Sequence, residues 1–216
     1  MIEMGYGMGG LEQRLEAVAK DVASRFDEIT YIEIGVGEGK TLTAIASVLR
    51  ASEKKWRAIG IELVNGYSFS RETTEEFARF RNLKLNFVTP NGSIADPLWQ
   101  TVTIYFKDSQ SFLTELWRSS VQFALIDGCH GKPCATLDFL ALEAFAVPRS
   151  IVMFHDFSED QAGHSQPHCP TGCDVRGACY DLGLLTNKRP NWKFNEMFVG
   201  DRMKGGWDMG VFEKTK

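Results

Sequence analysis

The sequence predicts an α/β fold in which helices cover both faces of a mostly parallel sheet. Apolar runs of strand length alternate along the chain with segments whose apolar residues recur at helical spacing. The clearest pair is the run at residues 31–34 and the helical spacing of Leu42, Ile45, Ala46 and Leu49. With 216 residues, the chain fits one domain of ordinary size.

Each predicted element follows from one of these two patterns, in alternating order along the chain. An amphipathic helix precedes the first strand, because Leu11, Leu15, Val18 and Val22 share one helical face. The predicted helices span residues 11–26, 41–51, 71–80, 111–118, 135–145 and 174–185. The predicted strands span residues 31–34, 57–62, 101–106, 121–126, 150–154, 193–199 and 208–213, with a further candidate at 83–88.

A glycine-rich turn separates the first strand from the helix that follows it. Gly35, Gly37 and Gly39 alternate with other residues, and Glu33 stands two positions before the first of them. Glycine permits positive φ and lets backbone approach a ligand closely. The spacing G-x-G-x-G differs from the dinucleotide pattern G-x-G-x-x-G, which disfavours a nicotinamide dehydrogenase. The turn predicts a nucleotide-like ligand, and a βα turn that binds nothing is the alternative.

Polar residues also follow three later predicted strands. Glu62 ends the strand at 57–62, at the spacing where a carboxylate holds ribose hydroxyls in such folds; an exposed acid is the alternative. Asp127-Gly-Cys-His130 and His155-Asp156 end two consecutive apolar strands. Because parallel strands end at one edge of the sheet, these side chains should converge there.

These motifs together resemble a known family. The pattern E-x-G-x-G-x-G at 33–39 resembles motif I of class I S-adenosylmethionine-dependent methyltransferases. The segments at 126–130 and 152–156, with Asp138 between them, resemble the signature of the methyltransferase family 24 group, which is related to catechol-type and cephalosporin-pathway O-methyltransferases. This resemblance covers roughly residues 31–156. It implies a single methyltransferase domain over 1–216, with a Rossmann-like, mostly parallel seven-stranded sheet closed by a C-terminal antiparallel hairpin.

The resemblance implies S-adenosylmethionine as the methyl donor. The glycines would pass under its methionine moiety, with Glu33 nearby and Glu62 at the ribose. Asp108 and Ser109, which directly follow a strand, would hold the adenine, although either residue could simply cap the next helix. The cofactor-binding residues expected on this basis are Glu33, Gly35, Gly37, Gly39, Glu62, Asp108, Ser109 and Asp127.

The same resemblance implies an acceptor site built from the two strand-end clusters. In related metal-dependent enzymes, the positions of Asp127, His155 and Asp156 hold a magnesium ion that binds substrate oxygens. His155 departs from an all-oxygen site, because imidazole suits manganese, iron or zinc better than magnesium. If a metal binds, the expected ion is Mg, as the resemblance implies, or Mn, with zinc less expected. His130 stands where catechol-type relatives carry a lysine general base, and capping of the turn is its alternative role. The predicted catalytic residues are Asp127, His130 and His155.

A late segment concentrates histidine and cysteine in an insertion or lid at residues 157–180. The candidate ligands of a zinc ion are His164, His168, Cys169, Cys173 and Cys179, although their spacing matches no standard zinc pattern. The alternative is an irregular loop with reduced cysteines that covers the acceptor site. Cys129 is expected to be a small buried thiol in a tight turn.

Composition narrows the class of partner. A net charge of -4 gives no reason to expect nucleic-acid binding, and no apolar run is long enough to cross a membrane. No signal peptide is visible in the first ten residues, so we expect a cytoplasmic protein. Residues 1–30 are expected to form an N-terminal helical segment. We predict O-methylation of a small molecule, with nitrogen acceptors next. A non-catalytic S-adenosylmethionine-binding protein is the alternative, and the oligomeric state stays open, a homodimer included.

Overall fold

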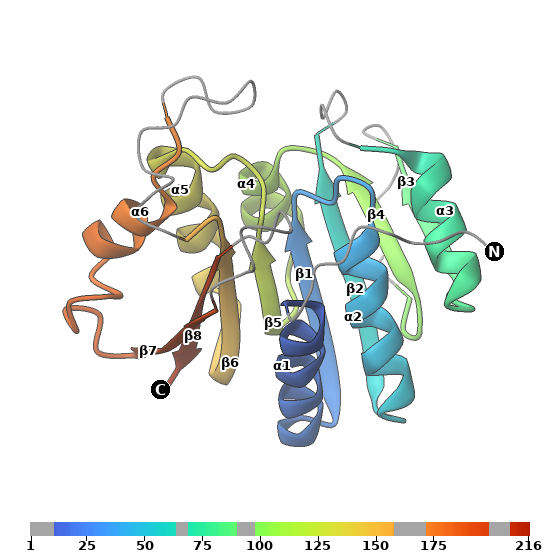
Figure 1. The fold of residues 1–216 in the computed structure, drawn as a ribbon, viewed down its shortest axis with the longest axis horizontal. Helices are drawn as coiled ribbons and strands as arrows, with labels where there is room; N and C mark the ends of the chain where they lie inside the picture. The colour runs from blue at the N-terminus through green and yellow to red at the C-terminus, as the bar shows by residue number, and fades with distance from the viewer. Residues whose placement is uncertain (1–10, 64–68, 90–97, 158–171, 199–207) are drawn as a thin grey trace.

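The computed structural model describes residues 11–63, 69–89, 98–157, 172–198 and 208–216. Within them, one eight-stranded sheet lies between two layers of helices (Figure 1). The helices are α1 (Leu11–Arg25), α2 (Lys40–Ala51), α3 (Arg71–Phe80), α4 (Ser109–Ser111), the π-helix η1 (Phe112–Leu116), α5 (Lys132–Glu143) and α6 (Val175–Asp181). The strands are β1 (Glu28–Ile34), β2 (Lys55–Glu62), β3 (Leu85–Val88), β4 (Val102–Phe106), β5 (Val121–Ile126), β6 (Ala146–His155), β7 (Trp192–Phe198) and β8 (Met209–Lys214).

The strand order is β3-β4-β2-β1-β5-β6-β8-β7. All pairs from β3 to β6 are parallel, and β8 runs antiparallel to both β6 and β7. The predicted α/β class and the C-terminal antiparallel hairpin are therefore confirmed. The predicted number of seven strands is wrong by one, because Leu85–Val88 pairs with β4 as an edge strand.

Alternation of side chains along the central strands builds two apolar layers. Ile29 and Tyr31 of β1 belong to the layer that contains α1 and α2, whereas Ile32 and Ile34 belong to the layer that contains η1, α5 and α6. This period of two places every second side chain on the same face of the sheet. Because both faces are covered by helices, the strands read in the sequence as continuous apolar runs.

Two helices differ from their predicted bounds for local reasons. The helix predicted at 111–118 begins earlier, because the Asp108 carboxylate accepts a hydrogen bond from the Ser111 N–H at 2.9 Å, and it continues as a π-helix. The helix predicted at 174–185 ends at Asp181, where Gly183 adopts φ +78° and its N–H donates to the Tyr180 carbonyl. A positive φ at glycine commonly ends a helix in this way.

The turn after β1 is held between the two neighbouring strands. The Gly35 N–H donates to the Ile61 carbonyl of β2, and the Asp127 N–H donates to the Ile34 carbonyl. Gly35 has φ +84°, and a Cβ there would lie 2.2 Å from the Asp127 carbonyl oxygen. A Cβ on Gly39 would lie 2.5 Å from a side-chain carbon of Thr74 in α3. Two of the three glycines are thus required by packing within the chain, besides any ligand.

None of the helices in the described ranges is long and apolar enough to cross a membrane.

Replacement of Gly35 by alanine should destabilise the fold strongly. The new methyl group would collide with the backbone of β5, which cannot move as a side chain can, and we expect a loss of about 3 kcal/mol or more in the free energy of unfolding. Gly183→Ala is the matched control, since Gly183 also has positive φ but its nearest neighbour would lie 3.0 Å away, at a side-chain atom. Urea unfolding of both variants measures the difference, and equal losses would contradict the packing role of Gly35.

Candidate functional site

The candidate site lies along the sheet edge where the parallel strands end, at the top of Figure 1. The turn after β1, Glu62 at the end of β2, the turn after β4 and the polar ends of β5 and β6 all meet this edge. Open α/β sheets bind ligands at this edge because loops there are free to vary while the strands fix their positions.

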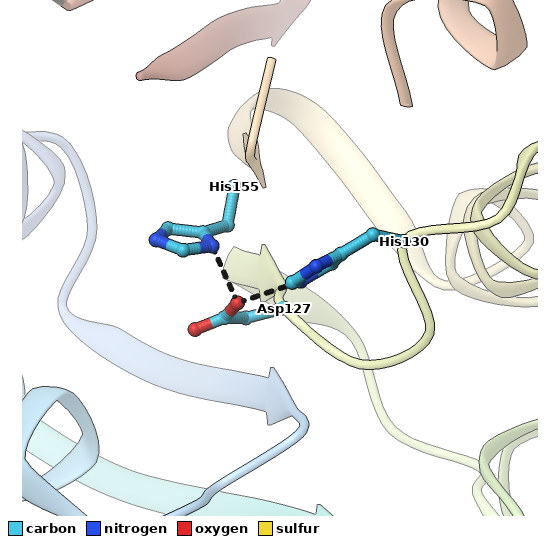
Figure 2. Close-up of side chains that lie close together, drawn as sticks. All are labelled: Asp127, His130 and His155. Carbon is cyan, nitrogen blue, oxygen red and sulfur yellow. Dashed lines mark hydrogen bonds and ion pairs between the residues drawn. The ribbon is translucent and has the colours of Figure 1, made fainter. Parts of the chain in front are cut away.

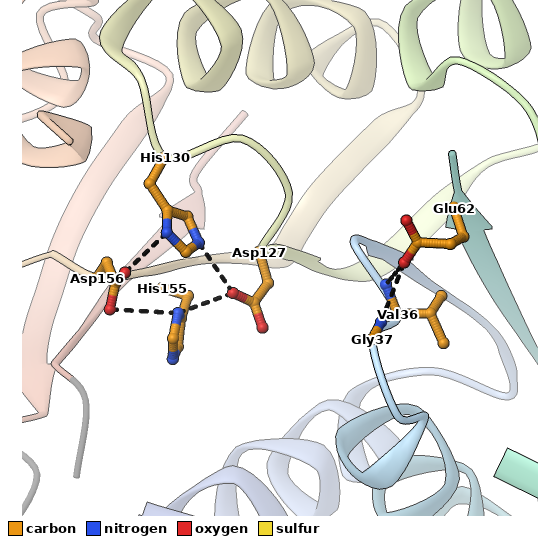
Figure 3. A network of polar contacts seen from close by, with 7 residues as sticks. All are labelled: Val36, Gly37, Glu62, Asp127, His130, His155 and Asp156. Carbon is orange, nitrogen blue, oxygen red and sulfur yellow. Dashed lines mark hydrogen bonds and ion pairs between the residues drawn. The ribbon is translucent and has the colours of Figure 1, made fainter. Parts of the chain in front are cut away.

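Glu62 holds the glycine-rich turn from the neighbouring strand (Figure 3). Its Oε2 accepts hydrogen bonds from the Val36 N–H at 2.8 Å and the Gly37 N–H at 3.0 Å. Its Oε1 accepts from the Leu63 N–H at 2.9 Å. Glu62 therefore has a structural role that the sequence analysis missed, and its expected contact with a ribose stays a prediction.

Glu33 lies behind the turn rather than on its surface. Its side chain is 1% exposed, and its Oε2 accepts a hydrogen bond of 2.5 Å from the Tyr31 hydroxyl. Burial raises the pKa of Glu33 well above its ordinary value, although hydrogen bonds from Tyr31 and from the Leu42 backbone N–H oppose this shift. The expected contact of Glu33 with the cofactor is untested and stays a prediction.

The turn after β4 is fixed by two carboxylates. Asp108 caps the helix that follows, which agrees with the alternative role expected for it. The Ser109 hydroxyl donates to Asp138 Oδ1 of α5 at 2.6 Å, and Asp138 is 3% exposed. In the sequence, Asp138 stands out only as part of a motif. A buried acid on an apolar helix face was the available signal for a partner, since buried carboxylates are normally paired.

The polar ends of β5 and β6 converge as predicted (Figure 2). Asp127 Oδ1 lies 2.7 Å from His155 Nδ1 and 3.2 Å from His130 Nε2. Asp156 lies on the other side of the histidines, with Oδ2 2.8 Å from His130 Nδ1 and Oδ1 3.4 Å from His155 Nδ1 (Figure 3). Asp156 is buried and has φ +53°, an unusual backbone conformation that aspartate tolerates better than most residues.

Alternation of acids and imidazoles sets the charges in this cluster. Burial would lower the pKa of His130, but hydrogen bonds and charge from Asp127 and Asp156 outweigh it and raise the pKa to about 10. Burial would likewise raise the pKa of Asp127, but His155 and His130 lower it to about 2. Without a metal, His130 therefore keeps its proton at neutral pH, which opposes the general-base role expected for it.

Three side chains of the cluster form a set suited to a metal ion. One donor atom from each of Asp127, His130 and His155 lies within 4.8 Å of the others. Ligands of a metal with bonds of about 2.1 Å lie roughly 3 Å apart, and the contacts from Asp127 of 2.7 and 3.2 Å approach this spacing. The set contains His130 besides the predicted Asp127 and His155, and Asp156 contacts both imidazoles. The expected role of Asp156 as a metal ligand stays a prediction.

A disulfide closes the turn that carries His130. The sulfur atoms of Cys129 and Cys134 are bonded, and the corresponding Cα atoms are 5.7 Å apart. The prediction that Cys129 is a small buried thiol is therefore wrong. The missed signal is the pair of cysteines on either side of a short glycine-containing turn, which brings residues five positions apart together. The His130 carbonyl also accepts a hydrogen bond of 2.9 Å from the Asp174 N–H, which ties this turn to the start of α6.

The predicted zinc cluster is described only in part. Cys173 and Cys179 are buried and form no disulfide, and burial raises the pKa of the Cys179 thiol. The remaining candidates, His164, His168 and Cys169, lie outside the described residues, as does most of the insertion expected at 157–180. A zinc site in this segment stays a prediction.

Comparisons with known proteins identify the fold and the family. A family model for a methyltransferase domain, Methyltransf_24, matches residues 32–157, more than half of the chain. No protein of curated function matches the sequence.

Solved structures resemble the chain at low sequence identity. They include the O-methyltransferase TomG from Streptomyces achromogenes with SAM, at 13% identity and a TM-score of 0.62, covering 94% of this chain and 80% of that one. An O-methyltransferase from Bacillus cereus with SAH is 14% identical, with a TM-score of 0.61 and coverages of 96% and 81%. The O-methyltransferase NovP is 13% identical, with a TM-score of 0.63 and coverages of 95% and 80%. At these identities, the likeness shows the fold alone.

The charge of His130 gives a prediction about pH. Because its pKa is raised from 6.5 to about 10 in the folded protein, its stabilising contribution is complete below pH 6.5 and is lost as the pH rises toward 10. We expect the free energy of unfolding, measured with a chelator present, to fall between pH 6.5 and 10, and to fall less in His130→Gln. Histidine NMR should show the His130 ring still protonated at pH 8, and titration near 6.5 would contradict the cluster's charge assignment.

Proposed function

The chain belongs to the methyltransferase family whose model matches residues 32–157, and on this premise we propose that it transfers a methyl group from S-adenosylmethionine to a hydroxyl oxygen of a small molecule. The observation that carries the proposal is a contact between the glycine-rich turn, which would hold the methyl donor, and the group formed by Asp127, His130, His155 and Asp156, called here the acceptor cluster. The Gly35 backbone packs directly on the Asp127 carbonyl, so a cofactor on the glycine-rich turn would border Asp127 and His155.

The residues at the sheet edge suit this cofactor. The turn contains three glycines with positive φ, Gly35, Gly37 and Gly39, and Glu62 stands at the end of the adjacent strand. When bound, S-adenosylmethionine supplies a methyl group on a positively charged sulfur. The protein's contribution is to hold the acceptor oxygen in line with that methyl group, which lowers the barrier through positioning.

The acceptor cluster favours oxygen over nitrogen. Asp127 is ionised at neutral pH, so beside the imidazoles of His130 and His155 its carboxylate can accept a hydrogen bond from an acceptor hydroxyl or bind a cation. Nitrogen acceptors follow as the second choice, since a neutral amine needs less help to lose a proton after transfer.

Asp127, His130 and His155 would hold a divalent cation. Two imidazoles and one carboxylate suit manganese or another first-row transition metal better than magnesium, which prefers oxygen ligands. Such an ion, when bound, would lower the pKa of the acceptor hydroxyl. Asp156 would then orient the His130 ring, because it contacts Nδ1 while Nε2 faces Asp127, as carboxylates do next to metal-binding histidines.

Transfer of label from S-adenosylmethionine to mixed small hydroxyl compounds tests the proposal. We expect turnover with manganese that is lost with a chelator, and a drop of about 100-fold or more in Asp127→Asn, with binding of S-adenosylhomocysteine retained. Saturable cofactor binding without transfer to any acceptor would favour the alternative of a non-catalytic binding protein.

Asp156 provides a separate test of the metal site. Asp156→Asn should weaken manganese binding about 10-fold to 100-fold, because the His130 imidazole loses the carboxylate that orients it through Nδ1. Asp181→Asn is the matched control, since Asp181 forms an exposed ion pair with Lys132 on neighbouring helices. Calorimetric titration with manganese alone measures the affinities, and equal affinity in both variants would contradict the role given to Asp156.

A further inference from the structure

Ser109 and Asp138 form a hydrogen-bonded pair that the proposed reaction does not use. Ser109 lies in the turn after β4, and its hydroxyl donates to Asp138 Oδ1 at 2.6 Å. Asp138 projects from α5 and is buried, and its other oxygen would lie 3.9 Å from a Cβ placed on Gly128 after β5. The carboxylate therefore lies between the turns that follow two strands of the same sheet edge.

The strand order places the base of a bound nucleoside over this turn, given the proposed function. The acceptor cluster stands at β5 and β6, the glycine-rich turn follows β1, and Glu62 ends β2. A ligand with its sulfur near Asp127 and its ribose near Glu62 continues along the edge to β4, where Phe106 pairs with Glu62. Ser109 is three residues beyond Phe106, so in this placement the base would lie beside the turn that carries the Ser109 hydroxyl.

The hydrogen bond to Asp138 decides whether the Ser109 hydroxyl can donate or accept toward a ligand. A serine hydroxyl has one hydrogen to donate and two lone pairs that accept. Here the hydrogen is committed to a carboxylate, so toward a ligand the oxygen can only accept. Burial raises the pKa of Asp138 to about 6, against the hydrogen bond from Ser109, and the carboxylate is therefore ionised at pH 8 and can only accept as well.

The neighbouring acid, Asp108, has a different contact in this turn. Asp108 Oδ1 accepts from the Ser111 N–H at 2.9 Å and starts the helix after β4. One oxygen of Asp108 thus caps the helix, whereas the Ser109 hydroxyl is oriented by Asp138.

We propose that Asp138 is a positioning residue that fixes the Ser109 oxygen as a hydrogen-bond acceptor and thereby selects an adenine base over hypoxanthine. The exocyclic amine of adenine donates to such an oxygen. Hypoxanthine presents a carbonyl oxygen at the same place, and two facing acceptors leave both groups without a hydrogen. This inference rests on the proposed function, because it assumes that an adenosyl cofactor binds at this edge.

The test compares S-adenosylhomocysteine with S-inosylhomocysteine by calorimetry at pH 8. For the native protein, we expect S-adenosylhomocysteine to bind about 10-fold to 100-fold more tightly than S-inosylhomocysteine. The inosyl compound would place its carbonyl oxygen against the Ser109 oxygen, so that two acceptors face each other. In Asp138→Asn, the amide can donate to Ser109, and the released serine hydrogen can turn toward the ligand. The preference should then fall by about 10-fold or more, mainly through tighter binding of the inosyl compound.

A second variant keeps the inference testable if Asp138→Asn does not fold. Ser109→Ala removes the acceptor and leaves α5 intact, so it should weaken the adenosyl compound about 10-fold while the inosyl compound keeps its affinity. Leu137→Ala is the control, since Leu137 is the neighbouring residue on α5 and is 47% exposed. It should leave both affinities unchanged.

The outcomes separate this inference from the proposed function. If the native protein binds neither compound, the proposed function itself fails, and the inference fails with it. If the native protein binds S-adenosylhomocysteine but Asp138→Asn weakens both compounds in parallel, Asp138 has only a structural role and the inference alone is overturned. Equal binding of the two compounds by the native protein would also overturn it.

Discussion

The close contact between the Gly35 backbone and the Asp127 carbonyl is the constraint on which the site depends. It is possible only because Gly35 has no Cβ, and it is held by the hydrogen bond from the Asp127 N–H to the Ile34 carbonyl. The contact joins the end of β1 to the end of β5 at a fixed distance. The backbone alone would therefore hold a ligand on the turn next to a substrate at Asp127.

The acceptor cluster is stable because its charges alternate. Asp127 and Asp156 flank the two histidines, and each imidazole lies close to both carboxylates. Such an arrangement offsets the cost of burying four ionisable groups, which would be high for any of them alone. It also places protons where a cation could replace them, which is the basis for the metal site proposed above.

Two carboxylates fix the conformation of the turns at this edge of the sheet. Glu62 receives two backbone N–H groups of the glycine-rich turn, and Asp138 receives the Ser109 hydroxyl. Each stands on an element next to the one it orients, so the turns keep their shape through contacts between neighbouring elements. The disulfide between Cys129 and Cys134 restrains the His130 turn in the same sense, through the chain itself.

The sequence by itself determined the alternation of strands and helices, the turn after β1 and the convergence of Asp127, His130, His155 and Asp156 at one edge. These follow from local periodicity and from the rule that parallel strands end together. Only the tertiary structure decided which atoms meet: that Glu62 accepts hydrogen bonds from the turn, that Asp156 contacts both imidazoles, and that Asp138 accepts the Ser109 hydrogen bond. The physical reason is that hydrogen bonds and charges depend on distances between residues remote in the chain, which periodicity does not encode.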